Sequence, residues 1–581
     1  MHFVKKVPTS EEEKAVKEKE RSIKLKVFCT VRDHIFEKRK RGKLDDEMLS
    51  LTQRLLEKNP DIYTFWNIRR DAIEKKIAAW KESQDSAKDD EEKVLFGKKI
   101  EYLLGGELFL TQTCLEANPK SYSAWFHRGW ALKRMKNPDF KRELALCEKA
   151  LKLDCRNFHT WDHRRVVAKL AKLGQDEELE FSNKLIGENF SNYSAWHYRA
   201  VLLPKMQNSK TGEYKLDDDT VAAELKKVTS AFFTDPEDQS AWVYSRWLLE
   251  MGSEKEFLRP DSLSPAVPLT VSFHGNNTTV VMSKACTLNE VFPYVNSLEE
   301  TEWRGVSALS SNPESARIWQ CMSDKSCIVQ LNQEDNKDLI DVSKKPYVNK
   351  ELLRRAFDLT RREPNVAIKS ITDNCKQLME MEPQNMWARY MYTLCLMETQ
   401  PAESHEEILS NLGKLATDLD TKRKEIYKKL ASRQILNKVL RSEVEGEALL
   451  EKLMKGEETQ LAIRNAKISS LDGVELLAGL VTNLDVSGNE ISSLDEVLLP
   501  NLEYLTANEN PIEKLAPSVT LCNVKFLSLG YCPVNEVNCI LPALKSMCSL
   551  ERFLYCETPL VSKTPELGKE LPNVRLIPHY L

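Results

Sequence analysis

The sequence predicts a multidomain, mainly α-helical protein that combines stacked helical hairpins, an inserted β-sandwich and a C-terminal leucine-rich repeat domain. Three observations carry this prediction. A Trp-containing phrase recurs six times, a segment rich in β-branched residues separates its fifth and sixth copies, and a second repeat of leucines fills the C-terminal part. The 581 residues correspond to three or four folded units at roughly 150 residues per domain.

The first repeat is a phrase in which a turn, with Pro in four of the six copies, precedes a Trp and an Arg. Its tryptophans are Trp66, Trp125, Trp161, Trp196, Trp242 and Trp387. Five copies keep an Arg three or four residues after the Trp, whereas Arg389 follows Trp387 by two, so the sixth copy is degenerate. The shortest spacings are 35 and 36 residues, which suit a helix-turn-helix unit with insertions in the longer gaps.

Each phrase is expected to begin a helix. Pro near a helix start has no amide hydrogen to leave unsatisfied, and the Asn or Asp before it is expected to cap the first turn. Trp and Arg three positions apart share one helix face. We expect the Trp and Tyr of the phrase to be core residues and the Arg to be a structural hydrogen-bond donor. A second apolar-periodic segment follows each phrase, such as 142–151, so each unit is a hairpin that must stack on its neighbours.

Three histidines lie beside the repeated tryptophans and resemble acid-base residues at first sight. They are His127, His163 and His197. Because they recur in successive hairpins, we expect them to serve packing or subunit contact rather than catalysis.

The segment between the fifth and sixth copies has a different amino-acid composition. Short β-branched runs at 265–273, 278–282, 316–322 and 327–331 are separated by turns rich in Gly, Asn, Ser and Pro. This pattern predicts an all-β insertion with the size of a small sandwich, whose ends lie close together because it interrupts a helical layer.

The C-terminal part carries the second repeat. The segments 481–491, 502–512 and 524–534 match the leucine-rich phrase, with weaker copies at 461–468 and 550–560. Asn489 and Asn510 are expected to bond backbone groups inside the turns, and Cys532 is the allowed alternative at the same position. These textures divide the chain into 1–250 (hairpin repeats one to five), 251–345 (β-sandwich), 346–445 (helical continuation with the sixth repeat) and 446–581 (leucine-rich repeats).

Composition excludes several classes of function. The 84 Lys and Arg balance 88 Asp and Glu, and the net charge of -4 provides no basic field for nucleic acid or an anionic membrane. No stretch reaches the roughly 18 apolar residues that a membrane span needs. The 14 cysteines form no C-x-x-C pair, so we expect reduced thiols in a cytoplasmic protein without stable membrane insertion.

The recurring Asn-Tyr-x-x-Trp-x-x-Arg phrase resembles the repeat of protein prenyltransferase α subunits. With the β insertion and the leucine-rich domain, the whole chain resembles the branch of that family that acts on Rab GTPases. The resemblance implies a crescent-shaped right-handed superhelix with an immunoglobulin-like insertion. It also implies an enzyme: the α subunit of a heterodimer that transfers geranylgeranyl from geranylgeranyl diphosphate to C-terminal cysteines, of CC or CXC type, on Rab GTPases presented by a Rab escort protein.

Prenyl transfer to a thiol needs a metal that deprotonates the cysteine, an apolar tunnel and cations for the departing diphosphate. No complete zinc ligand set can be assembled from this sequence. The resemblance places the zinc, the tunnel and most diphosphate cations on a separate β subunit of α-α barrel form, so this chain binds no cofactor by itself.

The resemblance also implies a few site residues. The family has a lysine before the aromatic phrase of an early repeat that reaches the diphosphate, and Lys120 stands at that position. A lysine near a helix N-terminus adds charge beside free amides, which suits a leaving diphosphate. Tyr122 offers the nearest hydroxyl, and Arg156 occupies the matching place in the next repeat as a weaker substrate-binding candidate. His2, on the N-terminal segment, is a candidate contact to the partner's zinc.

A function from another class is also consistent with the repeats. In this alternative, the helical hairpins and the leucine-rich repeats form a non-enzymatic scaffold that only binds proteins. The Trp-Arg phrases and the position of Lys120 favour the enzyme subunit, whereas activity in neither the chain alone nor a co-expressed pair would favour the scaffold.

Overall fold

The computed structural model divides the chain into two compact units, residues 1–214 and 215–581. It describes residues 11–86, 90–211, 216–251, 266–274, 277–296, 303–307, 314–322, 328–333, 336–342, 345–357, 366–517 and 521–579. His2 lies outside the described residues. None of the described helices has both the length and the apolar character of a membrane-spanning segment.

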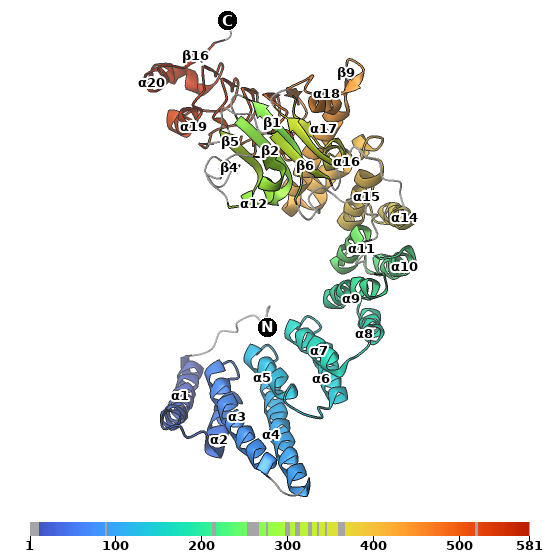
Figure 1. Ribbon diagram of the computed structural model, residues 1–581, viewed down its shortest axis with the longest axis vertical. Helices are drawn as coiled ribbons and strands as arrows, with labels where there is room; N and C mark the ends of the chain where they lie inside the picture. The colour runs from blue at the N-terminus through green and yellow to red at the C-terminus, as the bar shows by residue number, and fades with distance from the viewer. Residues whose placement is uncertain are drawn as a thin grey trace. The chain divides into compact units, whose positions relative to one another are not determined.

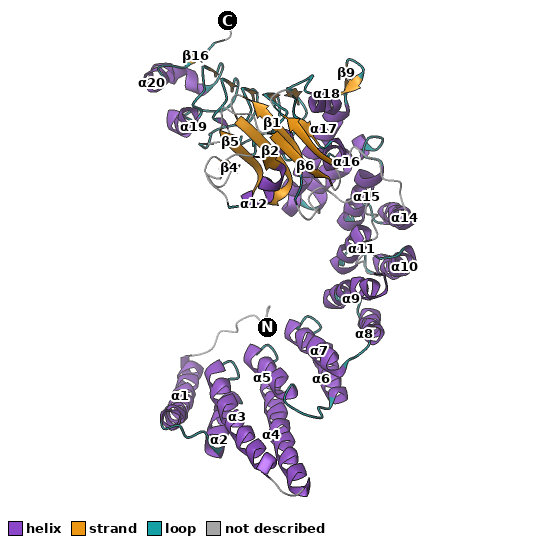
Figure 2. Cartoon of the chain, in the orientation of Figure 1, coloured by secondary structure: helices purple, strands orange, loops and turns teal. Residues whose placement is uncertain are grey.

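The first unit is helical throughout the part that the structure describes (Figures 1 and 2). Its helices are α1 (Glu11–Lys40), α2 (Asp46–Leu56), α3 (Tyr63–Ser86), α4 (Asp90–Ala117), α5 (Tyr122–Leu132), α6 (Phe140–Leu153), α7 (Phe158–Ala171), α8 (Gln175–Glu188) and α9 (Tyr193–Thr211). Helices α2/α3, α4/α5, α6/α7 and α8/α9 pack as hairpins, which confirms the predicted helix-turn-helix units.

The helix caps differ from the expectation. The cap is the residue just before the aromatic one: Ser121 Oγ accepts the amide of Ala124 at 3.4 Å. Asn118, which precedes the Pro, instead accepts the amide of Lys120 at 3.1 Å and closes an Asx turn. The proline therefore lies in the turn outside the helix, and the prediction that the preceding Asn or Asp caps the helix was wrong.

The first five repeated tryptophans are buried, as expected, and the indole of each bonds its own turn. Tyr63, Tyr122 and Tyr193 are exposed, so the prediction that the tyrosines of the phrase are core residues was wrong. The indole N–H donates to the carbonyl six residues earlier; Trp66 bonds Pro60 at 2.8 Å and Trp125 bonds Pro119 at 2.9 Å. The same carbonyl accepts a second bond from the cap of the next hairpin. Ser121 Oγ donates to Pro60 at 3.2 Å, so the second hairpin is fixed against the turn of the first.

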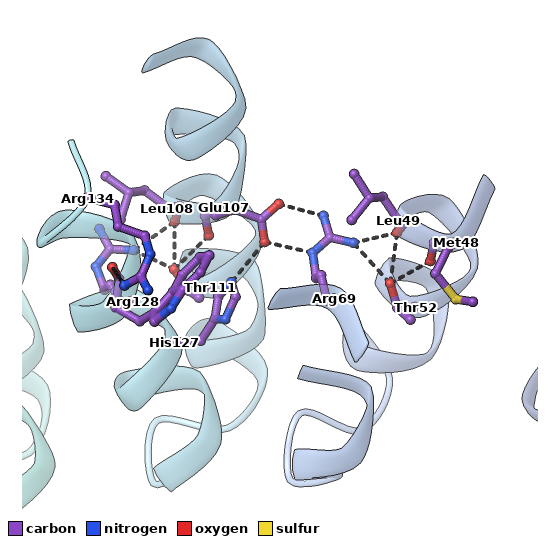
Figure 3. Close-up of polar contacts among 11 residues, drawn as sticks. Met48, Leu49, Thr52, Arg69, Glu107, Leu108, Thr111, His127, Arg128 and Arg134 are labelled. Carbon is purple, nitrogen blue, oxygen red and sulfur yellow. Dashed lines mark hydrogen bonds and ion pairs between the residues drawn. The ribbon is translucent and has the colours of Figure 1, made fainter. Parts of the chain in front are cut away.

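A buried polar ladder joins successive hairpins (Figure 3). Arg69 on α3 forms two hydrogen bonds with Glu107 on α4, at 2.7 and 2.8 Å, and a third with Thr52 on α2 at 3.2 Å. His127 Nε2 lies 2.9 Å from the same Glu107 carboxylate. Each glutamate therefore connects the Arg of the preceding hairpin with a His of its own hairpin, and both charges are paired where water is excluded.

The ladder repeats at the next two steps with one change. Arg128 bonds Glu143 at 2.6 and 2.8 Å, and His163 lies 3.2 Å from that carboxylate. At the following step Tyr198, not His197, occupies the position and donates to Glu178 at 2.6 Å. His197 is exposed and its ring stacks on Tyr193, so it differs from His127 and His163, which are buried.

The second unit begins with helices of the same kind. Its longer helices are α10 (Asp218–Thr234), α11 (Gln239–Met251), α14 (Val366–Met381), α15 (Met386–Thr399), α16 (His405–Lys414) and α17 (Lys424–Arg441); α12 (Leu288–Val291), α13 (Lys350–Ala356), α18 (Leu449–Lys455), α19 (Leu541–Ser546) and α20 (Thr564–Glu570) are short. Asn385 Nδ2 donates to the Pro236 carbonyl at 3.0 Å, so the helical stack resumes after the insertion. In the degenerate sixth copy, Arg389 bonds Asn411 at 2.7 Å in place of a glutamate, and Trp387 is only half-buried.

The insertion forms two antiparallel sheets, which confirms a separate β region. The strands are β1 (Pro268–His274), β2 (Asn277–Cys286), β3 (Val295–Asn296), β4 (Trp303–Val306), β5 (Ala316–Met322), β6 (Ile328–Gln333), β7 (Asn336–Asp341) and β8 (Tyr347–Val348). One sheet has the order β4-β5-β2-β1-β8 and the other β3-β6-β7.

The C-terminal part forms a six-stranded parallel sheet. Its strands are β11 (Gln460–Ala462), β12 (Asn483–Asp485), β13 (Tyr504–Thr506), β14 (Phe526–Ser528), β15 (Arg552–Leu554) and β16 (Arg575–Ile577); β9 (Glu443–Val444) and β10 (Glu447–Ala448) pair separately. Asn489 and Asn510 bond backbone groups of adjacent turns, as predicted.

The β region packs directly against this parallel-sheet region. Asn501 accepts from Thr279 Oγ1 at 3.0 Å and donates to Ser272 Oγ at 3.3 Å. A Cβ at Gly479 would lie 2.9 Å from Ser272 Oγ, so only glycine allows this close approach. His274 adds a contact to Glu503 at 3.1 Å.

Removing one partner of the ladder should be far more damaging than removing an exposed charge. Arg128→Met leaves the Glu143 carboxylate buried without its main partner, and we expect a loss of about 3–5 kcal/mol in the free energy of unfolding. The matched control is Lys184→Met, whose pair with Glu148 is exposed and should change stability by less than about 1 kcal/mol. Chemical denaturation followed by Trp fluorescence measures both; equal losses would contradict the assignment.

The ladder also predicts acid sensitivity. Burial lowers the pKa of His163, although Glu143 opposes this shift. An unfolded histidine takes up its proton near pH 6.5. Between that pH and the lower folded pKa the unfolded state binds more protons, so stability present above about pH 6.5 is lost as the pH falls.

Replacing His163 should reduce the loss of folding stability as the pH falls. His163→Gln keeps a hydrogen-bond donor for Glu143 without the titration, so its free energy of unfolding should decline less than that of the wild type between about pH 6.5 and 5. His197→Gln, at an exposed position, is the control. Parallel pH profiles for wild type and His163→Gln would show that the buried ring is not responsible.

Candidate functional site

The turn between α4 and α5 presents Lys120 on a rigid backbone. The Pro119 carbonyl just before it accepts two bonds, from Trp125 Nε1 at 2.9 Å and from Asn157 Nδ2 at 3.0 Å. The Lys120 amide is held by Asn118, and Ser121 caps the helix that follows. The backbone at Lys120 is thus fixed from both sides, while 59% of its side chain stays exposed.

The neighbouring turn brings a carboxylate to Lys120 and carries a second cation. Asp154 Oδ2 lies 3.6 Å from Lys120 Nζ. Asp154 Oδ1 accepts the amide of Arg156 at 3.1 Å, and Arg156 is exposed on the same turn. The structure therefore places the two cations predicted from the sequence on adjacent turns.

Tyr122 lies at the first position of α5 with its ring 69% exposed. Its ring centroid is 4.2 Å from that of His159, in an edge-to-face arrangement, and 5.9 Å from that of Phe158. Burial lowers the pKa of His159; Asp162 opposes this and the charge of Lys120 reinforces it. The imidazole is therefore neutral near pH 7 and adds no positive charge beside Tyr122.

The arrangement suits the binding of an anion. An exposed ammonium and an exposed guanidinium beside the starts of α5 and α7 are groups that suit a phosphate. His127 and His163 are buried and engaged by glutamates, so neither can act as a base. Among the described residues, no group of three or more His, Cys, Asp or Glu side chains could hold a metal ion such as zinc.

Two nearby residues were missed from the sequence. Asp154 and His159 belong to the repeat after that of Lys120 and reach it only through stacking. The glutamates of the ladder were also missed, although each precedes its His or Tyr partner by 20 residues. That constant spacing is a signal that the sequence already contains.

The side-chain amide of Asn157 is expected to restrain the backbone of the Lys120 turn. Asn157→Asp keeps the oxygen that caps α7 through the His159 amide at 3.1 Å, but it removes the donor to Pro119. We expect faster hydrogen exchange of amides 120–124 at a cost of about 1 kcal/mol. Asn385→Asp is the matched control, because it removes the equivalent bond to Pro236. Unchanged exchange around Lys120 would contradict this role.

Comparisons with known proteins agree with the helical-hairpin fold. The family described as protein prenyltransferase alpha subunit repeat matches residues 104–135, 140–170, 176–206 and 221–252, which correspond to the hairpins from α4/α5 to α10/α11. A protein of Candida albicans, the geranylgeranyltransferase-I complexed with GGPP, has a TM-score of 0.41 at 14% identity and covers 70% of this chain and 91% of that chain. The family assignment does not depend on that likeness.

Two relatives extend the similarity over most of the chain. The geranylgeranyl transferase type-2 subunit alpha of Sus scrofa is 34% identical over 99% of this chain and 100% of its own length. The protein of the same name from Homo sapiens is 34% identical over 89% of this chain and 88% of its own length. The chain therefore belongs to the family of geranylgeranyl transferase type-2 alpha subunits, which are protein prenyltransferase subunits.

Proposed function

We propose that this chain is the α subunit of a heterodimer that transfers geranylgeranyl from geranylgeranyl diphosphate to C-terminal cysteines of Rab GTPases presented by a Rab escort protein. Family membership supports the reaction. The single observation that carries the role of this chain is the Lys120 turn, whose backbone is fixed by Trp125 and Asn157 while the ammonium group stays exposed.

Lys120 would stabilise the charge that develops on the diphosphate as the bond to the isoprenoid breaks. A positioned cation acts on the transition state because the leaving group gains charge there. Tyr122 can donate a hydrogen bond from its exposed hydroxyl to the same group, and Arg156 is the second, weaker cation. The cysteine thiolate and its zinc belong to the β subunit in this proposal, and His2 remains a candidate contact to that zinc.

A row of exposed aromatic residues supports a partner on this face of the first unit. Tyr63, Tyr122, Phe158 and Tyr193 are the first residues of α3, α5, α7 and α9, and between 46% and 69% of each side chain is exposed. Aromatic side chains exposed in a row are typical of protein interfaces. We assign this row to the β subunit, because the same helix starts carry Lys120.

The strand arrangement supports a fold assignment for the β insertion and for the C-terminal region. Two antiparallel sheets, which lie within 251–345 except for β8, support an immunoglobulin-like sandwich there. Parallel strands with Asn489 and Asn510 in the turns support leucine-rich repeats over 446–581. We assign the helical repeats to 1–250 and 346–445, the bounds that the sequence predicts. The 13 described cysteines are free thiols, which supports a cytoplasmic location.

The test replaces Lys120 in the co-expressed heterodimer. Loss of one charged contact to the diphosphate should lower the turnover number of Lys120→Met by about tenfold to a hundredfold, since hydrogen bonds to charged groups contribute about 1.5–3 kcal/mol. Lys120→Arg should recover part of it. Lys152→Met, at an exposed lysine of α6, is the control.

The measurement is transfer of labelled geranylgeranyl to an escort-bound Rab, with heterodimer assembly checked by size-exclusion chromatography. Wild-type turnover in an assembled Lys120→Met heterodimer would refute the diphosphate role. No activity in the assembled wild-type pair would favour the scaffold alternative.

A further inference from the structure

The stacking register places particular turn residues opposite each other. The first residue of one turn faces the third residue of the preceding turn. Asn118 Nδ2 donates to Asp61 Oδ2 at 2.9 Å, and Asp154 occupies the corresponding place opposite Lys120, at 3.6 Å. The Lys120–Asp154 pair is thus fixed by the repeat geometry, and both residues stay accessible to solvent.

The charge of Asp154 is not needed to form its turn. The corresponding residues of the other turns in the first unit are Asn59, Asn118 and Asn189, and each accepts the amide two residues later, at 3.0–3.3 Å. Asp154 makes the same bond with Oδ1 alone. Its second oxygen, Oδ2, carries a charge that the turn does not use, and this oxygen faces Lys120.

We propose that Asp154 is a positioning residue that holds the Lys120 ammonium in the unliganded subunit and competes with diphosphate for it. This inference rests on the proposed role of Lys120. When diphosphate enters, its oxygens displace the carboxylate from the ammonium, so diphosphate binding costs the contact between Lys120 and Asp154. Asp154 therefore weakens diphosphate binding and favours release of the product.

The inference predicts tighter binding of diphosphate when the charge is removed. Asp154→Asn retains the oxygen that accepts the Arg156 amide, so the turn is preserved. In the assembled heterodimer we expect inorganic pyrophosphate to compete with geranylgeranyl diphosphate about two- to fivefold more strongly, a size set by the weakness of exposed ion pairs. The gain should shrink at high ionic strength. Asp176→Asn, at an exposed position of α8, controls for net charge.

A double-mutant cycle with Lys120→Met separates the outcomes. The gain should vanish in the Lys120→Met background, because there is no ammonium for Asp154 to hold. Unchanged or weaker pyrophosphate binding in Asp154→Asn would overturn the inference, and so would a gain that persists without Lys120. If Lys120→Met alone leaves pyrophosphate binding unchanged, the diphosphate role of Lys120 fails first and the role of Asp154 fails with it.

Discussion

A backbone carbonyl with two donors is the interaction on which the helical stack depends. At Pro60, Pro119 and Pro236 the carbonyl accepts the indole N–H of its own hairpin and a side-chain donor from the next one. The first bond closes the turn and the second fixes the distance to the next hairpin. Because both donors are side chains, the identities of these residues determine the spacing between hairpins. The Arg–Glu ladder adds buried charge pairs that penalise any other register.

Much of the fold was predictable because it is periodic. The Trp spacing revealed the hairpins, and the leucine phrase located strands β11 to β15. Strand β16 was missed because the residues that follow Arg575 lack the asparagine of the phrase. The caps were assigned wrongly because Asn118 and Ser121 can both accept an amide. Only the three-dimensional turn decides between them.

The site was predictable only in part, for a different reason. Lys120 and Tyr122 were identified through a resemblance to a family, not through a pattern that demands them. Asp154 and His159 lie more than 30 positions further along the chain, and neighbouring turns bring them to Lys120. Contacts between repeats depend on stacking register, which a single phrase does not specify. The glutamates of the ladder are an exception, since their distance from the His or Tyr partner is constant.

The close approach at Gly479 joins the β insertion and the C-terminal repeats, which therefore constrain each other's evolution. The β insertion and the C-terminal repeats are far apart in sequence, yet Ser272 and Thr279 meet Asn501 in a buried polar contact that leaves no room for a side chain at Gly479. Losing either region would expose the other's matching face to water. During divergence the two are therefore expected to be inherited or discarded as one module, although the chain encodes them in separate segments.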